Sequence, residues 1–360
     1  MSSPDVLVVG GGVIGLASSW LLAREGLTVT VLDAGALGGQ SSQAAAGILG
    51  PLTESVDDGP LTRLLWESLQ AYPGWIEALS EDADRDPEWE RSGIRQVFPA
   101  EARASGLQSL RWRRLYDPDV VWQEAGPGEP WSGAVWSPHE GQLYGPAYLD
   151  ALGQAGRRRG VAFRAGETVT RLVVEHGRSV GVVTRSGARH AAGSVMLAAG
   201  AWTGRLWGRE QAVFPVRGQV MGIVAPERPF SHVRFGPGGY IVPKRSGLVI
   251  VGATEDHSGF DPRITATGLV TLSQRLRELA PELEGLPFKR AWAGLRPATS
   301  DGLPILGPDP EVEGLFVATG HYRNGLLLSP ITAQAIRAWV QGTAPRDDIA
   351  WDAFSPARFA

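Results

Sequence analysis

Three glycines near the amino terminus, Gly10, Gly12 and Gly15, have the spacing G-x-G-x-x-G. They follow the β-branched run Val6–Val9 and precede a helical pattern that continues to Leu22. In this context the first glycine allows a tight turn and the second lets the backbone approach a pyrophosphate, while the third permits close packing of helix on strand. The N–H groups and dipole at the helix N-terminus then attract phosphates. The pattern predicts a dinucleotide site.

An acidic residue ends the next strand-like run, 28–32, where it can accept hydrogen bonds from a ribose. This residue is Asp33. A carboxylate at this place disfavours a 2′-phosphate and therefore NADP, but it leaves NAD and FAD both open.

Two further segments favour FAD. Residues 37–49 form a small-residue stretch with hydroxyls at Ser41 and Ser42, where backbone can pass close to a flat ring. Residues 318–327, Ala-Thr-Gly-His-Tyr-Arg-Asn-Gly-Leu-Leu, follow a strand-like run and lead into a helical pattern. Such a loop can direct N–H groups at the flavin edge on which negative charge develops during reduction.

Together these segments resemble the D-amino-acid oxidase family of FAD-dependent amine oxidases, and within it the glycine oxidase branch of bacterial thiamine biosynthesis. The resemblance covers nearly the whole chain. It rests on GGGVIG at 10–15, SSQAAAGIL at 41–49, GYIVPKRSG at 239–247, IVGAT at 250–254, WAGLRP at 292–297 and GHYRNGLLLSP at 320–330.

The resemblance implies a role for several side chains. Arg296 would bind the substrate carboxylate, which suits the planar fork of a guanidinium. Tyr240 would donate its hydroxyl to the same carboxylate, and Arg323 would lie where substrate and flavin meet. Besides the three glycines, the implied cofactor contacts are Val13, Ile14, Asp33, Ala34, Ser41, Ser42, Ala46, Gly47, Ile48, Val169, His321, Tyr322, Arg323, Asn324, Gly325, Leu326 and Leu327.

Each of these assignments has a structural alternative. Without its motif, an arginine between apolar residues more often belongs to a structural ion pair. A tyrosine flanked by glycine can be a half-buried strand aromatic. Ser41 and Ser42 lack the G-x-S-x-G context of a hydrolase nucleophile.

The implied reaction is the oxidative deamination of glycine, sarcosine or a small D-amino acid on non-covalent FAD. Hydride transfer to flavin N5 would give an imine, which hydrolyses to glyoxylate and ammonia when glycine is the substrate, while O₂ becomes hydrogen peroxide. The imine would pass to a thiazole synthase. Positioning suffices for this chemistry, without a strong side-chain base. Ile48, Tyr322 and Gly238-Gly239 depart from common family residues and leave the size of the amine open.

Other functions fit parts of the pattern. A sarcosine or other secondary-amine oxidase and an amino-acid dehydrogenase with another electron acceptor remain possible, although the chain has no cysteine for a thioether-linked flavin. The 318–327 loop argues against an NAD-dependent dehydrogenase. Arg296, Tyr240 and Arg323 argue against a non-catalytic nucleotide-binding interaction module.

Composition sets wider limits. The chain has 360 residues, a net charge of −4 and no cysteine, which argues against nucleic-acid or membrane partners and against thiolate metal sites. The six histidines show no ligand spacing, so we expect no metal. Residues 6–23 are apolar but lack a preceding positive region, so we expect a cytoplasmic protein. The resemblance implies a homo-oligomer, a tetramer in related enzymes.

The order of elements predicts how these residues are positioned. A mononucleotide-binding unit comes first, β-rich sequence lies in the middle, and a strand–loop–helix unit comes last. We expect a helix start at 41–47 and helical patterns at 61–78, 148–159, 269–279 and 331–340. We therefore expect a Rossmann-like α/β FAD-binding domain and a discontinuous α+β substrate-binding domain rich in β-sheet. The FAD-binding domain would comprise 1–82, 139–208 and 288–345, the substrate domain 83–138 and 209–287, and a tail 346–360.

Overall fold

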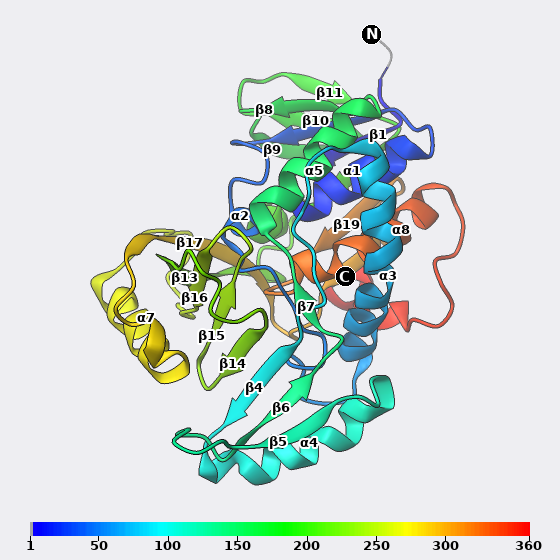
Figure 1. Cartoon of the computed structure of the whole chain (residues 1–360). Helices are drawn as coiled ribbons and strands as arrows, with labels where there is room; N and C mark the ends of the chain where they lie inside the picture. The colour runs from blue at the N-terminus through cyan, green and yellow to red at the C-terminus, as the bar shows by residue number, and fades with distance from the viewer. Residues whose placement is uncertain (1–2) are drawn as a thin grey trace.

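The computed structural model describes residues 3–360 and contains two main sheets (Figure 1). Residues of both sheets line one cavity. The first sheet has six strands in the order β18-β19-β12-β1-β2-β8. Its strands run parallel except β18 at the edge. They span Val6–Val9 (β1), Val29–Asp33 (β2), Ala162–Ala165 (β8), Ser194–Leu197 (β12), Ile305–Pro308 (β18) and Leu315–Thr319 (β19).

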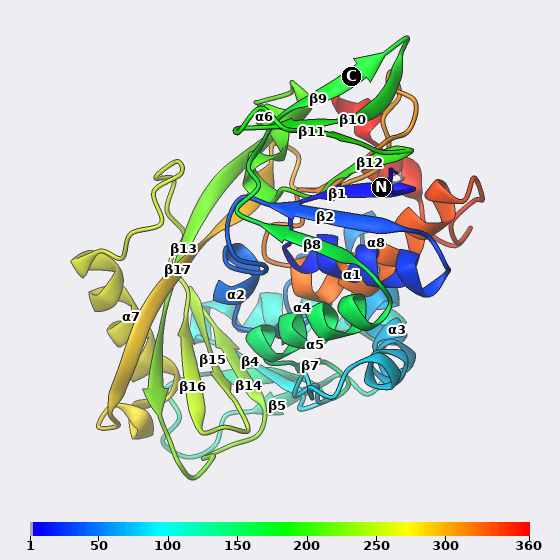
Figure 2. The same ribbon diagram turned by 90° about the horizontal axis from the view of Figure 1, so that it is seen from above.

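The two faces of this sheet are covered differently because side chains alternate along a strand. Val6 and Val8 of β1 pack against helices, whereas Leu7 and Val9 pack toward a small antiparallel sheet. The helices are α1 (Val13–Arg24), α3 (Pro60–Asp82), α5 (Gly145–Arg158) and α8 (Gly325–Val340), and the small sheet is β9 (Val169–Glu175), β10 (Arg178–Thr184) and β11 (Arg189–Ala191). Figure 2 shows this layering, with the small sheet above the parallel strands and α1, α5 and α8 below.

The second main sheet has eight strands in the order β17-β13-β16-β15-β14-β4-β6-β5. All neighbours are antiparallel except β14 and β4. They span Ile94–Phe98 (β4), Val121–Glu124 (β5), Gly133–Ser137 (β6), Val213–Val224 (β13), Val233–Gly236 (β14), Gly239–Pro243 (β15), Leu248–Gly252 (β16) and Phe288–Thr299 (β17).

Two helices pack against this sheet, one on each face. Leu272, Leu276 and Leu279 of α7 (Ala266–Leu279) join a core with residues of β13 and β16, and α4 (Arg103–Tyr116) packs at the β5–β6 end (Figure 1). The remaining elements are α2 (Ser41–Ala44), β3 (Ile48–Leu49), β7 (Gly141–Gln142), α6 (Thr203–Trp207) and the 3₁₀ turns η1 (Ala100–Ala102), η2 (Gly200–Trp202), η3 (Pro281–Leu283), η4 (Trp351–Phe354) and η5 (Pro356–Phe359).

The predicted fold class is confirmed: a parallel, helix-covered sheet accompanies a largely antiparallel second sheet. The division into domains remains a prediction, and the strand pairing argues for one change in it. β17 pairs with β13 along nearly its whole length, so we would move the boundary at 288 to the end of β17. The segment 346–360 packs on the first sheet's helices through Phe354, which is fully buried.

Two sequence-based expectations about elements need correction. The helix expected at 331–340 begins six residues earlier, at Gly325, and contains Pro330. The expected helix start at 41–47 is a single turn, Ser41–Ala44, followed by extended chain. Among residues 3–360, no helix combines the length and apolar character that crossing a membrane requires.

Candidate active site

A cavity of about 870 Å³ extends from the carboxyl end of β1 to the larger sheet. Most of the predicted site residues line it, although they come from both ends and the middle of the chain. The lining includes Gly10, Gly12, Val13, Ile14, Asp33, Ala34, Ser41, Ser42, Ala46, Gly47, Ile48, Val169, Tyr240, Arg296, His321, Tyr322, Arg323, Gly325 and Leu326. Gly15, Asn324 and Leu327 do not line it; a β-carbon at Gly15 would collide with the carbonyl of Gly10, and Leu327 is core.

The glycine-rich turn opens α1 toward the cavity. Gly10 has a φ of +112°, in the region that favours glycine, and a β-carbon there would strike the carbonyl of Ala198. The turn is tied to the following segment, because the N–H of Val13 donates to Ser42 Oγ at 3.0 Å. The result is a helix N-terminus that faces open space, the arrangement that binds phosphates.

Asp33 ends β2 beside this turn. Its carboxylate accepts the N–H of Gly11 at 2.7 Å and the N–H of Gly35 at 2.8 Å. Two backbone donors therefore fix the carboxylate at the cavity wall. Its remaining lone pairs are available to hydroxyl donors such as those of a ribose.

The loop before α8 forms the opposite end of the cavity. Tyr322 has a φ of +50°, and its N–H donates to the carbonyl of Pro297 at 2.9 Å. His321 is buried, and its Nε2 lies 3.1 Å from Thr332 Oγ1. Burial lowers the pKa of His321 to about 3, so the imidazole is neutral at physiological pH and anchors the loop against α8. The residues present therefore fit FAD, with a phosphate-binding helix N-terminus at one end and that of α8 at the other.

Arg296 and Tyr240 meet on the larger sheet. Arg296 is half-buried on β17 and its Nη1 donates to the carbonyl of Thr254 at 3.1 Å. Burial raises the pKa of Tyr240, and the neighbouring Arg296 opposes that rise. The tyrosine therefore keeps its proton and can donate beside the guanidinium. A carboxylate is the ligand that matches such a pair of donors.

Glycines in the neighbouring strands make room for both side chains. A β-carbon at Gly218 of β13 would overlap the Arg296 guanidinium, and one at Gly252 of β16 would overlap the Tyr240 ring. A β-carbon at Gly294 of β17 would lie 2.7 Å from Ala44 Cβ, so this glycine admits α2. Sequence reasoning assigned these glycines no site role, although glycine inside an apolar strand is itself a signal of close approach.

Sequence reasoning also missed Glu54. Its side chain is 7% exposed, and Oε2 lies 3.4 Å from Nε of Arg323. Burial raises the pKa of Glu54 to about 7, against the opposing effect of Arg323. The turn before it is held by the buried Glu140, which accepts the N–H groups of Leu52 at 2.6 Å and Thr53 at 3.0 Å. No local pattern marks Glu54, since its burial depends on contacts with distant segments.

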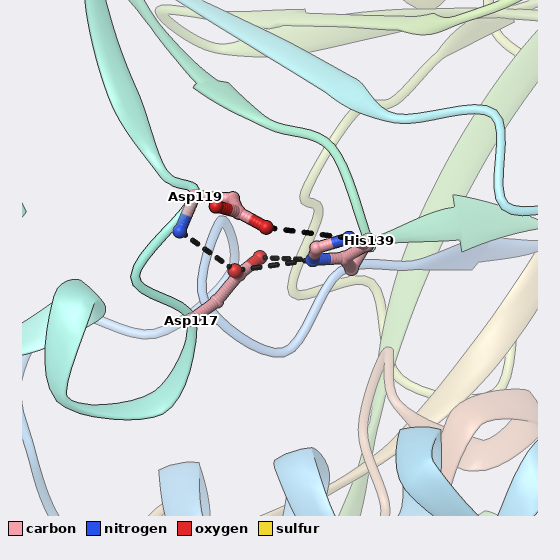
Figure 3. Close-up of side chains that lie close together, drawn as sticks. All are labelled: Asp117, Asp119 and His139. Carbon is pink, nitrogen blue, oxygen red and sulfur yellow. Dashed lines mark hydrogen bonds and ion pairs between the residues drawn. The ribbon is translucent and has the colours of Figure 1, made fainter.

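A separate cluster joins Asp117, Asp119 and His139 outside the cavity lining (Figure 3). Nδ1 of His139 lies 3.1 Å from both carboxylate oxygens of Asp117, and Nε2 lies 3.7 Å from Asp119. Each imidazole nitrogen thus faces a different carboxylate. The histidine thus bridges the two carboxylates, and one ligand atom from each of the three residues lies within 4.8 Å of the others.

Comparison with known proteins supplies independent information. The family model described as FAD dependent oxidoreductase (DAO) matches residues 5–339. The chain is 35% identical to a glycine oxidase of Geobacillus kaustophilus (strain HTA426), over 96% of this chain and 95% of that protein. A crystal structure of glycine oxidase from Geobacillus kaustophilus superposes with a TM-score of 0.93 at 33% identity, covering 99% of this chain and 98% of that one.

A second kind of relative is longer. The chain is 36% identical, over 99% of its length, to a bifunctional protein ThiO/ThiG of Synechocystis sp. (strain ATCC 27184 / PCC 6803 / Kazusa). It covers 54% of that protein, about half of its length.

Proposed function

The chain belongs to the family of FAD-dependent oxidoreductases, and from this premise we propose that it deaminates glycine or a similarly small amine with O₂ as electron acceptor. It is an FAD-dependent amino-acid oxidase of the glycine oxidase kind. The family excludes the NAD-dependent dehydrogenase and the non-catalytic nucleotide-binding module as alternatives. Sarcosine and small D-amino acids are the other substrates that the proposal includes.

FAD is held without a covalent bond in this proposal. Gly10–Ile14 and the α1 N-terminus would hold the pyrophosphate, Asp33 would hold the ribose, and Val169 would add a further contact to the cofactor. The segments 41–48 and 321–326 would hold the flavin. When bound, FAD supplies the acceptor for two electrons from the amine carbon and passes them to O₂, which leaves as peroxide.

The protein's own contribution to the reaction is orientation. Arg296 donates to the substrate carboxylate in the plane of its guanidinium, and the protonated Tyr240 adds a third donor. Because two side chains fix the carboxylate, the direction in which the hydrogen on the α-carbon points is restricted. His321 is neutral and turned toward Thr332, so the substrate amine must lose its proton without this imidazole.

The observation that carries the proposal is the pairing of Arg296 with Tyr240 inside the dinucleotide cavity. The first test is the visible absorption spectrum of the purified protein, in which flavin bands are expected as isolated or after FAD is added. Peroxide production with glycine, sarcosine and D-alanine then ranks the amines. If flavin bands were absent both before and after FAD is added, the proposed FAD-dependent activity would be contradicted.

We also propose that the imine formed from glycine passes to a thiazole synthase, and that the enzyme is a cytoplasmic homo-oligomer. The two-part ThiO/ThiG relative supports a physical link between this enzyme and a partner. With a thiazole synthase and its other substrates present, less glyoxylate should accumulate for each peroxide formed. An unchanged ratio of glyoxylate to peroxide would argue against transfer, and light scattering tests the oligomer.

A further inference from the structure

Arg275 reaches the cavity from α7, a helix that otherwise covers the outer face of the larger sheet. Its path crosses two consecutive glycines. A β-carbon at Gly239 would lie 2.7 Å from Arg275 Cδ, and one at Gly238 would lie 3.5 Å from Nη2. Any larger residue at 239 would displace the arginine, so this pair of glycines opens the wall for a guanidinium.

The guanidinium of Arg275 has no hydrogen-bond or ion-pair partner in the described part of the chain. Its Nη1 is buried without a hydrogen bond, and across residues 3–360 no carboxylate lies within ion-pair distance of it. Arg277, two residues farther along α7, differs from Arg275 because its guanidinium forms an ion pair with Glu284. Asp256, which follows β16, acts electrostatically on Arg275. Its carboxylate already accepts hydrogen bonds from Gln219 and Arg217.

Arg275 is half-buried, and a cation whose buried nitrogen has no hydrogen-bond acceptor is costly. Burial lowers the pKa of Arg275, while Tyr240, Glu278 and Asp256 act on it electrostatically in the opposite direction. Arginine nevertheless keeps its proton at neutral pH. An anionic ligand that contacted Nη1 would offset the cost of desolvation.

This end of the cavity has more arginines than an amine with one carboxylate requires for binding. Arg296, with Tyr240, suffices for one carboxylate. Arg323 already faces Glu54 at 3.4 Å. Arg275 lines the same cavity as Tyr240 and Arg296 and packs against Gly239, the neighbour of Tyr240, so it lies near the position of a substrate held by that pair, and its charge is unused.

We propose that Arg275 binds a second carboxylate where the substrate carries one, so that a small amine with two carboxylates is favoured over its counterpart with one. This inference rests on the proposed amine-oxidase function and narrows its substrate class. Arg296 and Tyr240 hold the carboxylate next to the reacting carbon, and Arg275 holds the distal one. Charge-assisted hydrogen bonds of this kind are the strong ones.

The kinetic test compares iminodiacetate with sarcosine, which differ by one carboxylate on the nitrogen substituent, and D-aspartate with D-alanine. In the flavin-bound enzyme we expect kcat/KM to favour the dicarboxylic member of at least one pair by about tenfold or more. In Arg275→Gln this preference should fall about tenfold, whereas Arg277→Gln on the same helix should retain it. Equal kcat/KM values within both pairs, or a preference that survives in Arg275→Gln, would overturn the inference.

A binding measurement keeps the test independent of turnover. Oxydiacetate and methoxyacetate carry an ether oxygen in place of the amine and also differ by one carboxylate. Titrated into the flavin-bound enzyme and followed by flavin absorbance, oxydiacetate should bind at least tenfold more tightly, and Arg275→Gln should abolish the difference. Equal affinities would refute the role of Arg275. If every amine tested is left unoxidised by the flavin-bound enzyme, the proposed function fails instead, and the binding ratio still decides the inference.

Discussion

At the scale of single residues, Arg296 carries the largest expected effect. Arg296→Met should lower kcat/KM for glycine roughly a hundredfold, because about two charge-assisted hydrogen bonds to the carboxylate are lost. Lys289→Gln, an exposed change on the same strand, should leave kcat/KM unchanged. Steady-state peroxide assays measure both. A normal kcat/KM in Arg296→Met, with FAD still bound, would show that the carboxylate binds elsewhere.

Because of Glu54, we expect the affinity for an anionic ligand to depend on pH. Because burial raises its pKa to about 7, Glu54 is protonated below that pH and leaves the charge of Arg323 uncompensated. Above it, Glu54 is ionised and neutralises Arg323. Methoxyacetate, which does not titrate in this range, should therefore bind several-fold more weakly at pH 8 than at pH 6.

Glu54→Gln should remove this pH dependence and bind methoxyacetate with similar affinity at both pH values, as flavin absorbance would record.

The raised pKa of Glu54 also affects the stability of the fold. A folded-state pKa raised above the unfolded value means that the native protein binds more protons between about pH 4.5 and 7. The contribution of Glu54 to the free energy of unfolding therefore falls as pH rises through that window.

Residues within short local patterns could be predicted from the sequence. The glycines at 10 and 12, Asp33, Tyr240 and Arg296 each lie in such a pattern, and all five line the same cavity. Glu54 and Arg275 could not be predicted in this way. Their surroundings come from segments distant in the chain, and on its own helix Arg275 resembles any surface arginine.

At the scale of elements, α8 depends on a partner helix. Pro330 has no N–H to donate to the carbonyl of Leu326, and that carbonyl instead accepts the hydroxyl of Tyr72 at 2.6 Å and of Ser329 at 2.8 Å. Tyr72→Phe should lower the free energy of unfolding by about 1–2 kcal/mol, and it should weaken FAD binding because Leu326 lies in the first turn of α8.

Chemical denaturation and FAD titration measure the two effects. Tyr116→Phe, on α4 away from the cavity, is the matched control and should change FAD affinity little. If Tyr72→Phe were as stable as the unchanged protein, the two hydroxyls could not be the compensation that Pro330 requires.

The same contact explains why the start of α8 was predicted wrongly. From the sequence, Pro330 marks a boundary, because proline interrupts the helical hydrogen-bond ladder. The compensating Tyr72 lies on α3, more than two hundred residues earlier. The strands and helix between 94 and 137 escaped prediction because strands of four or five residues carry little periodicity.

At the scale of the whole molecule, FAD would contact both main sheets, so its loss should affect the entire fold. Removing FAD should lower the Tm by several degrees, and adding it back should restore the Tm, since a ligand that binds the native state stabilises it. Differential scanning calorimetry checks this. An identical Tm with and without FAD would contradict a cofactor that bridges the two sheets.

Asp33→Ala should raise the Kd for FAD about tenfold, through loss of the ribose contact and of the bonds that hold Gly11 and Gly35. Asp347→Ala removes an exposed carboxylate of the same charge far along the chain and should not change the Kd. Fluorescence titration of the apoprotein with FAD measures both values. Equal Kd values for the two variants would exclude a role for Asp33.

The order of elements could be predicted from the sequence, because nucleotide-type units at both ends flank β-rich sequence. The division into domains stays a prediction. The pairing of β17 with β13, about seventy residues earlier, argues for moving the boundary at 288, and a pairing of that separation leaves no local trace in the sequence.

The position of β1 limits when its sheet and the cofactor site can form during synthesis of the chain. β1 lies in the middle of its sheet between β2 and β12, and β19 completes the parallel strands only at Thr319. A nascent chain that stops short of β12 already carries the whole glycine fingerprint, yet β1 then lacks a neighbour on one side and the wall formed by α8 does not exist. Cofactor capture must therefore wait until α8 has been synthesised. Until β12 pairs with it, β1 exposes an apolar strand edge of the kind that promotes aggregation.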